Sequence, residues 1–165
     1  TVTSGALAND YVYALRTLTC QWNGGTVTLI RTYVVINGVT VVLNSVNLSD
    51  HIASVTLDIT ADEIEETAFG QTFKSRLGGL KDGTLSIDFQ QDFASSEVDV
   101  TLFPLLGTVT TFVLKADAGS VSATNPSYSG SVLVNQHQPV ANGVGELASF
   151  SVSFPTSGTI TRATS

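Results

Sequence analysis

Every second residue is apolar along residues 52–60, and the same alternation returns along residues 85–90. Side chains in a strand point to opposite faces in turn, so each segment predicts a strand with one buried and one polar face. The apolar faces hold Val55, Leu57 and Ile59 in the first strand and Leu85, Ile87 and Phe89 in the second. The polar faces carry Asp58, Thr60, Asp62, Asp88, Gln90 and Asp92.

A helical period interrupts the β pattern between these two strands. Phe73, Leu77 and Leu80 recur at helical spacing, which predicts a short helix over residues 71–80 that caps a sheet edge. Asp82-Gly83 is a typical turn dipeptide and is expected to open the second strand. The acidic residues 63–66 either continue the first strand or form a turn.

A second helix is predicted to begin at Ser96. The order Ser-Glu-Val-Asp places a hydroxyl three residues before a carboxylate, as in a capping box. Pro104 should bend or shorten this helix, and Gly107 should end it before a strand over residues 108–115. One side of the helix is expected to pack on a sheet through Val98, Leu102, Leu105 and Leu106.

The remaining segments also indicate β structure. Asn37-Gly38 predicts a hairpin over residues 26–46, and two further strands are expected at residues 128–135 and 147–154. Residues 116–127 form a long loop, and residues 156–165 read as a tail that becomes ordered on a partner. Residues 1–30, with Asn23-Gly24-Gly25, form either a flexible arm or an extra hairpin, and residues 31–165 form the main domain.

Composition narrows the class of protein. The chain has 165 residues, with 14 acidic and 7 basic side chains and a net charge of −7, which argues against a phosphate-binding surface. The single cysteine, Cys20, cannot form an internal disulfide and is expected to be an ordinary thiol. No apolar run is long enough for a membrane helix, and no signal-peptide pattern opens the chain, so a soluble cytoplasmic product is expected.

Residues that could carry chemistry do not form a known pattern. His51 and His137 lack the partner spacing of a metal helix, and Ser49-Asp50-His51 has triad residue types only as chain neighbours. Calcium could be held by Asp58, Asp62, Asp88 and Asp92, but no calcium-loop motif is present, and a solvated acidic surface is the commoner explanation. We therefore expect no catalytic residue, no cofactor and no enzymatic activity.

The order of motifs in the chain resembles the tail tube proteins of long-tailed bacteriophages. The similarity covers about residues 31–163 and includes Glu-Thr-Ala-Phe-Gly70, Gly-Leu-Lys-Asp-Gly83 and Thr-Leu-Ser-Ile-Asp-Phe89. Later motifs that fit are Val98 to Gly107, Asn125-Pro126 with Tyr128-Ser-Gly130, Val144 to Ala148 and Thr156-Ser-Gly158. Residues 1–30 show no family pattern.

This resemblance implies a mainly β subunit, sandwich-like or barrel-like, with one or two short flanking helices. Such subunits join as hexameric rings that stack into a hollow tube, through which viral DNA passes without specific binding. The polar residues Asp58, Thr60, Asp62, Asp88, Gln90 and Asp92 would then face the lumen. Contacts between subunits would involve Glu65, Phe69, Phe73, Asn125, Pro126 and Tyr128.

The resemblance also implies partners and a location. The partners are further copies of the chain, a tape measure protein, and tail terminator or distal tail proteins. The product is expected in the virion tail after assembly in the host cytoplasm, with no membrane contact. Two alternatives stay open, namely the inner tube of a contractile tail or secretion-type injection machine, and a β-sandwich binding module.

Overall fold

The computed structural model describes residues 13–22, 25–34 and 38–165, and its side chains are described from residue 38 onward. The chain contains two compact units, Thr1–Gly38 and Val39–Ser165. In the first unit, β1 (Tyr13–Trp22) and β2 (Gly25–Val34) pair antiparallel from Tyr13 opposite Val34 to Trp22 opposite Gly25. The described residues of this unit therefore form one antiparallel hairpin, which extends beyond residue 30.

The predicted hairpin around Asn37-Gly38 is wrong. β2 pairs with β1, whereas β3 (Thr40–Leu43) pairs with β4 (Val46–Asn47) and β7 (Val109–Lys115). Asn37 itself lies outside the described residues. Val41 and Leu43 of β3 are completely buried. The pairing of this strand is therefore set by its packing beside β7 and not by the Asn37-Gly38 dipeptide.

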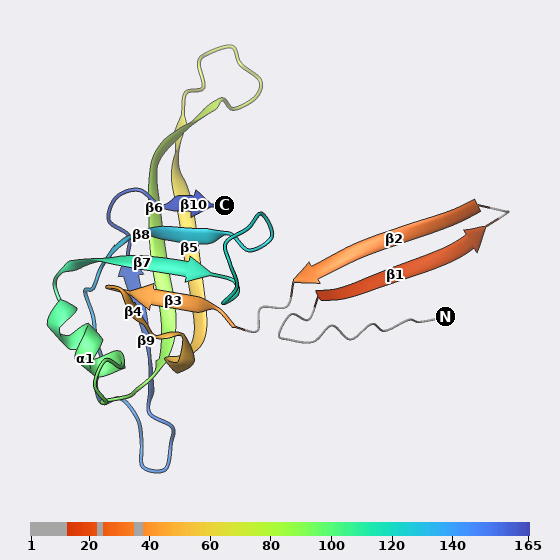
Figure 1. Cartoon of the computed structure of the whole chain (residues 1–165). Helices are drawn as coiled ribbons and strands as arrows, with labels where there is room; N and C mark the ends of the chain where they lie inside the picture. Colours follow the sequence, from red (N-terminus) through yellow and green to blue (C-terminus); the bar gives the residue numbers. More distant parts are fainter. Residues whose placement is uncertain (1–12, 23–24, 35–37) are drawn as a thin grey trace. The chain divides into compact units, whose positions relative to one another are not determined.

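The second unit contains two antiparallel sheets (Figure 1). The five-stranded sheet has the order β10-β8-β7-β3-β4, with β8 at Ser127–Leu133 and β10 at Thr161–Ala163. The three-stranded sheet has the order β5-β6-β9, with β5 at Ile52–Glu65, β6 at Arg76–Gln90 and β9 at Ser149–Pro155. The prediction of a mainly β fold is confirmed, and within the described residues neither sheet closes into a barrel.

One core lies between these two sheets. The buried faces of β6 and β9 contribute Leu85, Ile87, Phe89, Phe150, Val152 and Phe154, and the other sheet contributes Val41, Leu43, Phe112, Leu114 and Val132. Phe89 and Phe150 stack with their ring centroids 5.4 Å apart. The predicted apolar face of the second strand is confirmed. In β5, Val55 and Leu57 pack against this core, whereas Ile59 is 47% exposed.

The second predicted helix exists but starts later than expected. A short 3-10 turn, η1 (Ser49–His51), precedes β5. The helix α1 (Val98–Leu102) comes after β6 and leads directly into a second 3-10 turn, η2 (Phe103–Leu105). Ser96 has a left-handed φ of 68°, and no side chain caps the helix, so the predicted capping box does not form. Val98 and Leu102 are buried as expected, and the tighter turn begins beside Pro104. Gly107, with φ of 82°, precedes β7.

The predicted helix over residues 71–80 and the turn at Asp82-Gly83 are both wrong. Residues 76–90 form one continuous strand, β6, in which Leu77 lies opposite Ile64 and Asp82 lies opposite Thr60. A helix here would have no apolar surface to cover, since Phe73 and Leu80 are exposed. Gly83 serves close packing: a Cβ there would lie 3.0 Å from the Asp58 carbonyl oxygen and 3.0 Å from Thr156 Oγ1.

The C-terminal segment is ordered within the subunit. β10 pairs with β8, with Arg162 opposite Tyr128, so the prediction of a tail that becomes ordered only on a partner is wrong. An isolated bridge between Val132 and Thr156 and a hydrogen bond from Ser157 N to the Ser131 carbonyl lead the chain across to that sheet. Backbone pairing thus outweighs the low apolar content of the tail.

Candidate functional site

The outer face of the three-stranded sheet is polar. Across the register, Asp88 lies between Ser54 of β5 and Ser151 of β9, and Ser86 lies between Thr56 and Ser153. The hydroxyls of Ser54 and Ser151 both donate hydrogen bonds to the Asp88 carboxylate. These bonds, that of Ser151 foremost, lower the pKa of Asp88 below its ordinary value. Asp88 therefore joins all three strands of this face.

The residues predicted to face a lumen do not all lie on this polar face. Asp58 is exposed opposite Thr84, Thr60 is exposed opposite Asp82, and Gln90 lies opposite Ser149. Asp62 lies at an irregularity of the β5-β6 pairing, beside Gly79. Asp92 follows the end of β6, where its carboxylate accepts a hydrogen bond from Ala94 N and contacts His51.

β5 and β6 extend beyond the rest of their sheet as a two-stranded ribbon. β9 pairs with residues 84–90 of β6, and Thr156 N donates a further hydrogen bond to the Gly83 carbonyl, so residues 60–65 and 76–82 pair with each other alone (Figure 1). Two ion pairs link these strands and the loop that joins them: Arg76 Nε lies 2.5 Å from Glu63 Oε1, and Lys74 Nζ lies 2.7 Å from Glu65 Oε2. We call residues 60–82 the arm.

The arm ends in exposed aromatic side chains. Glu66 N donates to the Ser75 carbonyl at 2.9 Å, and a turn follows at residues 68–71, in which Gly70 has φ of 89°. Phe69 and Phe73 extend from this closed loop with exposures of 109% and 86%. Nearer the sheet, Leu80 is 81% exposed. The tip of the projecting ribbon is therefore an exposed apolar surface within the described residues.

The opposite end of the same sheet carries another exposed apolar group. The loop of residues 138–148 leads into β9, whose first residue, Ser149, lies opposite the last residue of β6. Because the arm holds the start of β6, this loop and the arm tip lie at opposite ends of the sheet (Figure 1). Val140, Val144 and Leu147 in the loop are 86%, 108% and 69% exposed.

The remaining predicted contact residues have structural roles inside the subunit. Asn125 is only 6% exposed, and its Nδ2 donates to the carbonyls of Asp117, Gly119 and Ser120 at 3.2 to 3.3 Å. These bonds hold the long loop of residues 116–126 in one shape. Pro126 is half-buried, and Tyr128 packs against the core from β8.

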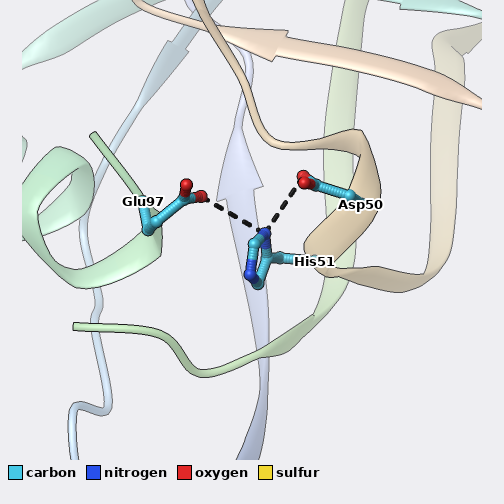
Figure 2. Close-up of side chains that lie close together, drawn as sticks. All are labelled: Asp50, His51 and Glu97. Carbon is cyan, nitrogen blue, oxygen red and sulfur yellow. Dashed lines mark hydrogen bonds and ion pairs between the residues drawn. The ribbon is translucent and has the colours of Figure 1, made fainter. Parts of the chain in front are cut away.

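A charged cluster surrounds His51, at the end of η1 (Figure 2). His51 Nδ1 lies 3.0 Å from Asp50 Oδ1 and 3.3 Å from Glu97 Oε2, and Nε2 lies 3.1 Å from Asp92 Oδ2. Burial acts to lower the pKa of His51, but the hydrogen bonds and charges of the carboxylates outweigh it and raise the pKa. Sequence spacing gave no sign of this cluster, because Asp92 is 41 residues from His51.

The second histidine is buried. The side chain of His137 is 2% exposed, its Nε2 lies 2.9 Å from Asp99 Oδ1, and its ring packs edge-on against Phe150 with centroids 5.3 Å apart. It therefore fastens the start of α1 to the core.

Of the four aspartates considered for calcium, Asp88 bonds to serines and Asp92 to His51. Among the described residues, the group that brings metal-ligating atoms together is Asp50, His51 and Glu97.

Comparisons with known proteins identify a shared fold. A scan against protein-family models gives no match, and neither does a search of curated proteins. Among the helices described, none has the length and apolar character to span a membrane. A chain from the virion of a native gene transfer agent particle is 14% identical with a TM-score of 0.62, over 76% of this chain and 95% of that one.

A second solved structure shows the same likeness. It is the tail of an empty gene transfer agent particle, computed with helical refinement and C6 symmetry. The match has 14% identity and a TM-score of 0.56, and it covers 68% of this chain and 82% of that one. At these identities the comparison establishes that this chain shares the mainly β fold of components of such particles.

Proposed function

We propose that this chain is a non-enzymatic structural subunit of a phage-like tail, in which copies form hexameric rings that stack into a hollow tube. The observation that carries the proposal is the arm, whose tip exposes Phe69 and Phe73 almost completely. In a subunit that remained monomeric, these exposed apolar side chains would make no stabilising contact. The fold shared with a tail refined in C6 symmetry supports both the tail and the sixfold ring.

Stacking would join opposite ends of the subunit. The arm tip and the loop of residues 138–148 are both apolar and lie at opposite ends of the three-stranded sheet. Contact between unlike surfaces of identical subunits is heterologous. Such contacts build an open filament unless the rotation from one subunit to the next closes them into a ring. An arm from one ring that packs on the loop end of the next ring would extend a tube in one direction.

Ring closure would use the free edges of the sheets. β5 and β9 are the outer strands of the three-stranded sheet, and β5 is 14 residues long. A long exposed edge invites pairing with another chain, and a closed ring of subunits satisfies every edge. The three-stranded sheets of neighbouring subunits would then form one continuous wall.

The polar face would line the channel of this tube. Asp58, Asp82 and Asp88 share that face with serine and threonine residues. A wall of carboxylates and hydroxyls repels phosphates, so DNA could pass through without binding. The proposal extends to contacts with a tape measure protein and with terminator or distal tail proteins, and to assembly in the host cytoplasm.

Electron microscopy of the purified protein tests the proposal. Rings or tubes are the expected result, and a protein that stays monomeric under all assembly conditions would favour a binding module. The channel is tested with Asp58→Lys, because Asp58 is exposed and makes no side-chain bond among those described. This variant should still form tubes but impair DNA passage, with Asp58→Asn as the milder control. Failure of Asp58→Lys alone to assemble would place Asp58 at an interface.

A further inference from the structure

The side chains around His51 converge from two separate parts of the chain. Asp50 and His51 belong to η1, which leads into β5, whereas Glu97 immediately precedes α1 (Figure 2). We propose that Asp50, His51 and Glu97 form a binding site for a transition-metal dication such as Zn²⁺, which ties these two segments together. This site is separate from the arm and from the polar sheet face, so it does not depend on the proposed function.

The charges of the cluster favour a dication. Three carboxylates, those of Asp50, Asp92 and Glu97, contact one imidazole. Among the described residues, the lysine and arginine ion pairs lie on the arm, at Lys74 and Arg76, and none reaches this cluster. The imidazole that binds a metal is neutral and offsets none of the three negative charges. A dication would therefore leave a net charge of −1 in the cluster.

The contact with Asp92 orients the imidazole for metal binding. Asp92 Oδ2 lies 3.1 Å from Nε2 and can accept a hydrogen bond from the Nε2–H group. The tautomer with a proton on Nε2 leaves the lone pair on Nδ1, which points between Asp50 and Glu97. A carboxylate that holds the far nitrogen of a ligating histidine is the usual arrangement in metal sites. Asp92 is therefore a positioning residue, and the other three side chains supply the ligand atoms.

The distances also suit a metal shell. Ligands about 2.1 Å from a metal lie about 3.0 Å apart at right angles and about 3.4 Å apart at the tetrahedral angle. His51 Nδ1 lies 3.0 Å from the Asp50 oxygen and 3.3 Å from the Glu97 oxygen. All three ligand atoms lie within 4.8 Å of one another, and Asp50, 75% exposed, can rotate to complete the set. Water would occupy the remaining positions.

The donor set selects the kind of ion. One imidazole nitrogen with two carboxylate oxygens suits Zn²⁺ and related transition metals, whereas Mg²⁺ and Ca²⁺ prefer oxygen alone. Magnesium therefore provides a test of specificity at equal charge. This test matters because a protein with net charge −7 attracts any dication weakly.

The experiment is a titration of the full chain with Zn²⁺ alone at about pH 8, above the ordinary histidine pKa. Histidine NMR resonances and the melting temperature are recorded. We expect saturable changes at the His51 ring and a rise in melting temperature, with at least about a tenfold loss of affinity in His51→Gln and in Glu97→Gln. Asp50→Asn, a change at an exposed side chain, keeps the test informative if the other variants fold poorly.

Two controls separate this site from weak surface binding. Asp58→Asn removes an equally acidic but distant side chain and should leave the Zn²⁺ affinity unchanged. Mg²⁺ at the same concentration should not reproduce the changes at His51. The site is refuted if Zn²⁺ leaves the His51 resonances unchanged, if Mg²⁺ acts equally, or if all three ligand variants bind Zn²⁺ as the wild type does.

Discussion

Replacement of both aromatic side chains at the arm tip should block stacking without weakening the subunit. Phe69 and Phe73 are 109% and 86% exposed, so Phe69→Ser with Phe73→Ser removes no packing from the isolated fold. Full burial of one phenylalanine side chain stabilises by about 1.5 to 3 kcal/mol. If a neighbouring copy covers about half of each ring, the pair contributes about 1.5 to 3 kcal/mol to each contact.

This free energy sets the size of the effect. Since about 1.4 kcal/mol corresponds to a factor of ten, the concentration needed for assembly should rise by about 10- to 150-fold in the double variant. The assay is sedimentation of assembled protein across a concentration series, with electron microscopy of the pellets. Thr72→Ala, in the same loop, is the matched control and should assemble like the wild type.

Two results would refute this reasoning. If the double variant assembles at the wild-type concentration, the aromatic tip is not buried between copies. If its unassembled form instead melts several degrees lower than the wild type, the two rings pack within the subunit, contrary to their exposure. A rise in the assembly concentration at an unchanged melting temperature is the expected outcome.

Other predictions concern the subunit alone. Because hydrogen bonds lower the folded-state pKa of Asp88, its contribution is complete above the ordinary carboxyl pKa of about 3.9 and is lost as pH falls through the folded value. Asp88→Asn should therefore weaken the fall of the unfolding free energy at acidic pH in a denaturation series. The change should be less than about 1 kcal/mol, since solvent screens this half-exposed group. An unchanged pH dependence of the unfolding free energy would disprove the role of Asp88. Gly83→Ala should destabilise by about 1 to 3 kcal/mol in urea unfolding, while Gly78→Ala, where a Cβ meets nothing within 4 Å, should stay near neutral. Asn125→Ala should cost about 1 to 3 kcal/mol and speed proteolysis in residues 116–126, and equal protease resistance would contradict its role in the loop.

The sequence predicted the features that depend on local alternation. Leu85, Ile87 and Phe89 are buried as their spacing requires, and Asp88 lies on the opposite polar face. The helix near Val98 was predicted from a capping box, which does not form, and from apolar positions on one side, of which Val98 and Leu102 are buried. These features need only near neighbours to be specified.

Features that depend on distant partners escaped prediction. Gly83 resembles a turn residue in sequence, yet its lack of a side chain serves contacts with Asp58 and with Thr156, 73 residues further along the chain. Phe73 and Leu80 have helical spacing, but Phe73 lies in the loop before β6, and pairing such as that of Ile64 with Leu77 places Leu80 in the strand. The His51 cluster likewise requires the β6-α1 connection to return beside η1, which no spacing rule contains.

The pairing order of the strands has a consequence for how the chain folds. β5 and β6 are joined by residues 66–75 alone, so their ribbon closes a short loop and can form early. β9 pairs with β6 about sixty residues later, and β10 pairs with β8 later still. The core between the sheets can therefore close only after β9 has been synthesised, because Phe150, Val152 and Phe154 belong to it. Until then, a nascent chain would expose the apolar face of β6, and exposed apolar surface of this kind makes folding intermediates prone to aggregate.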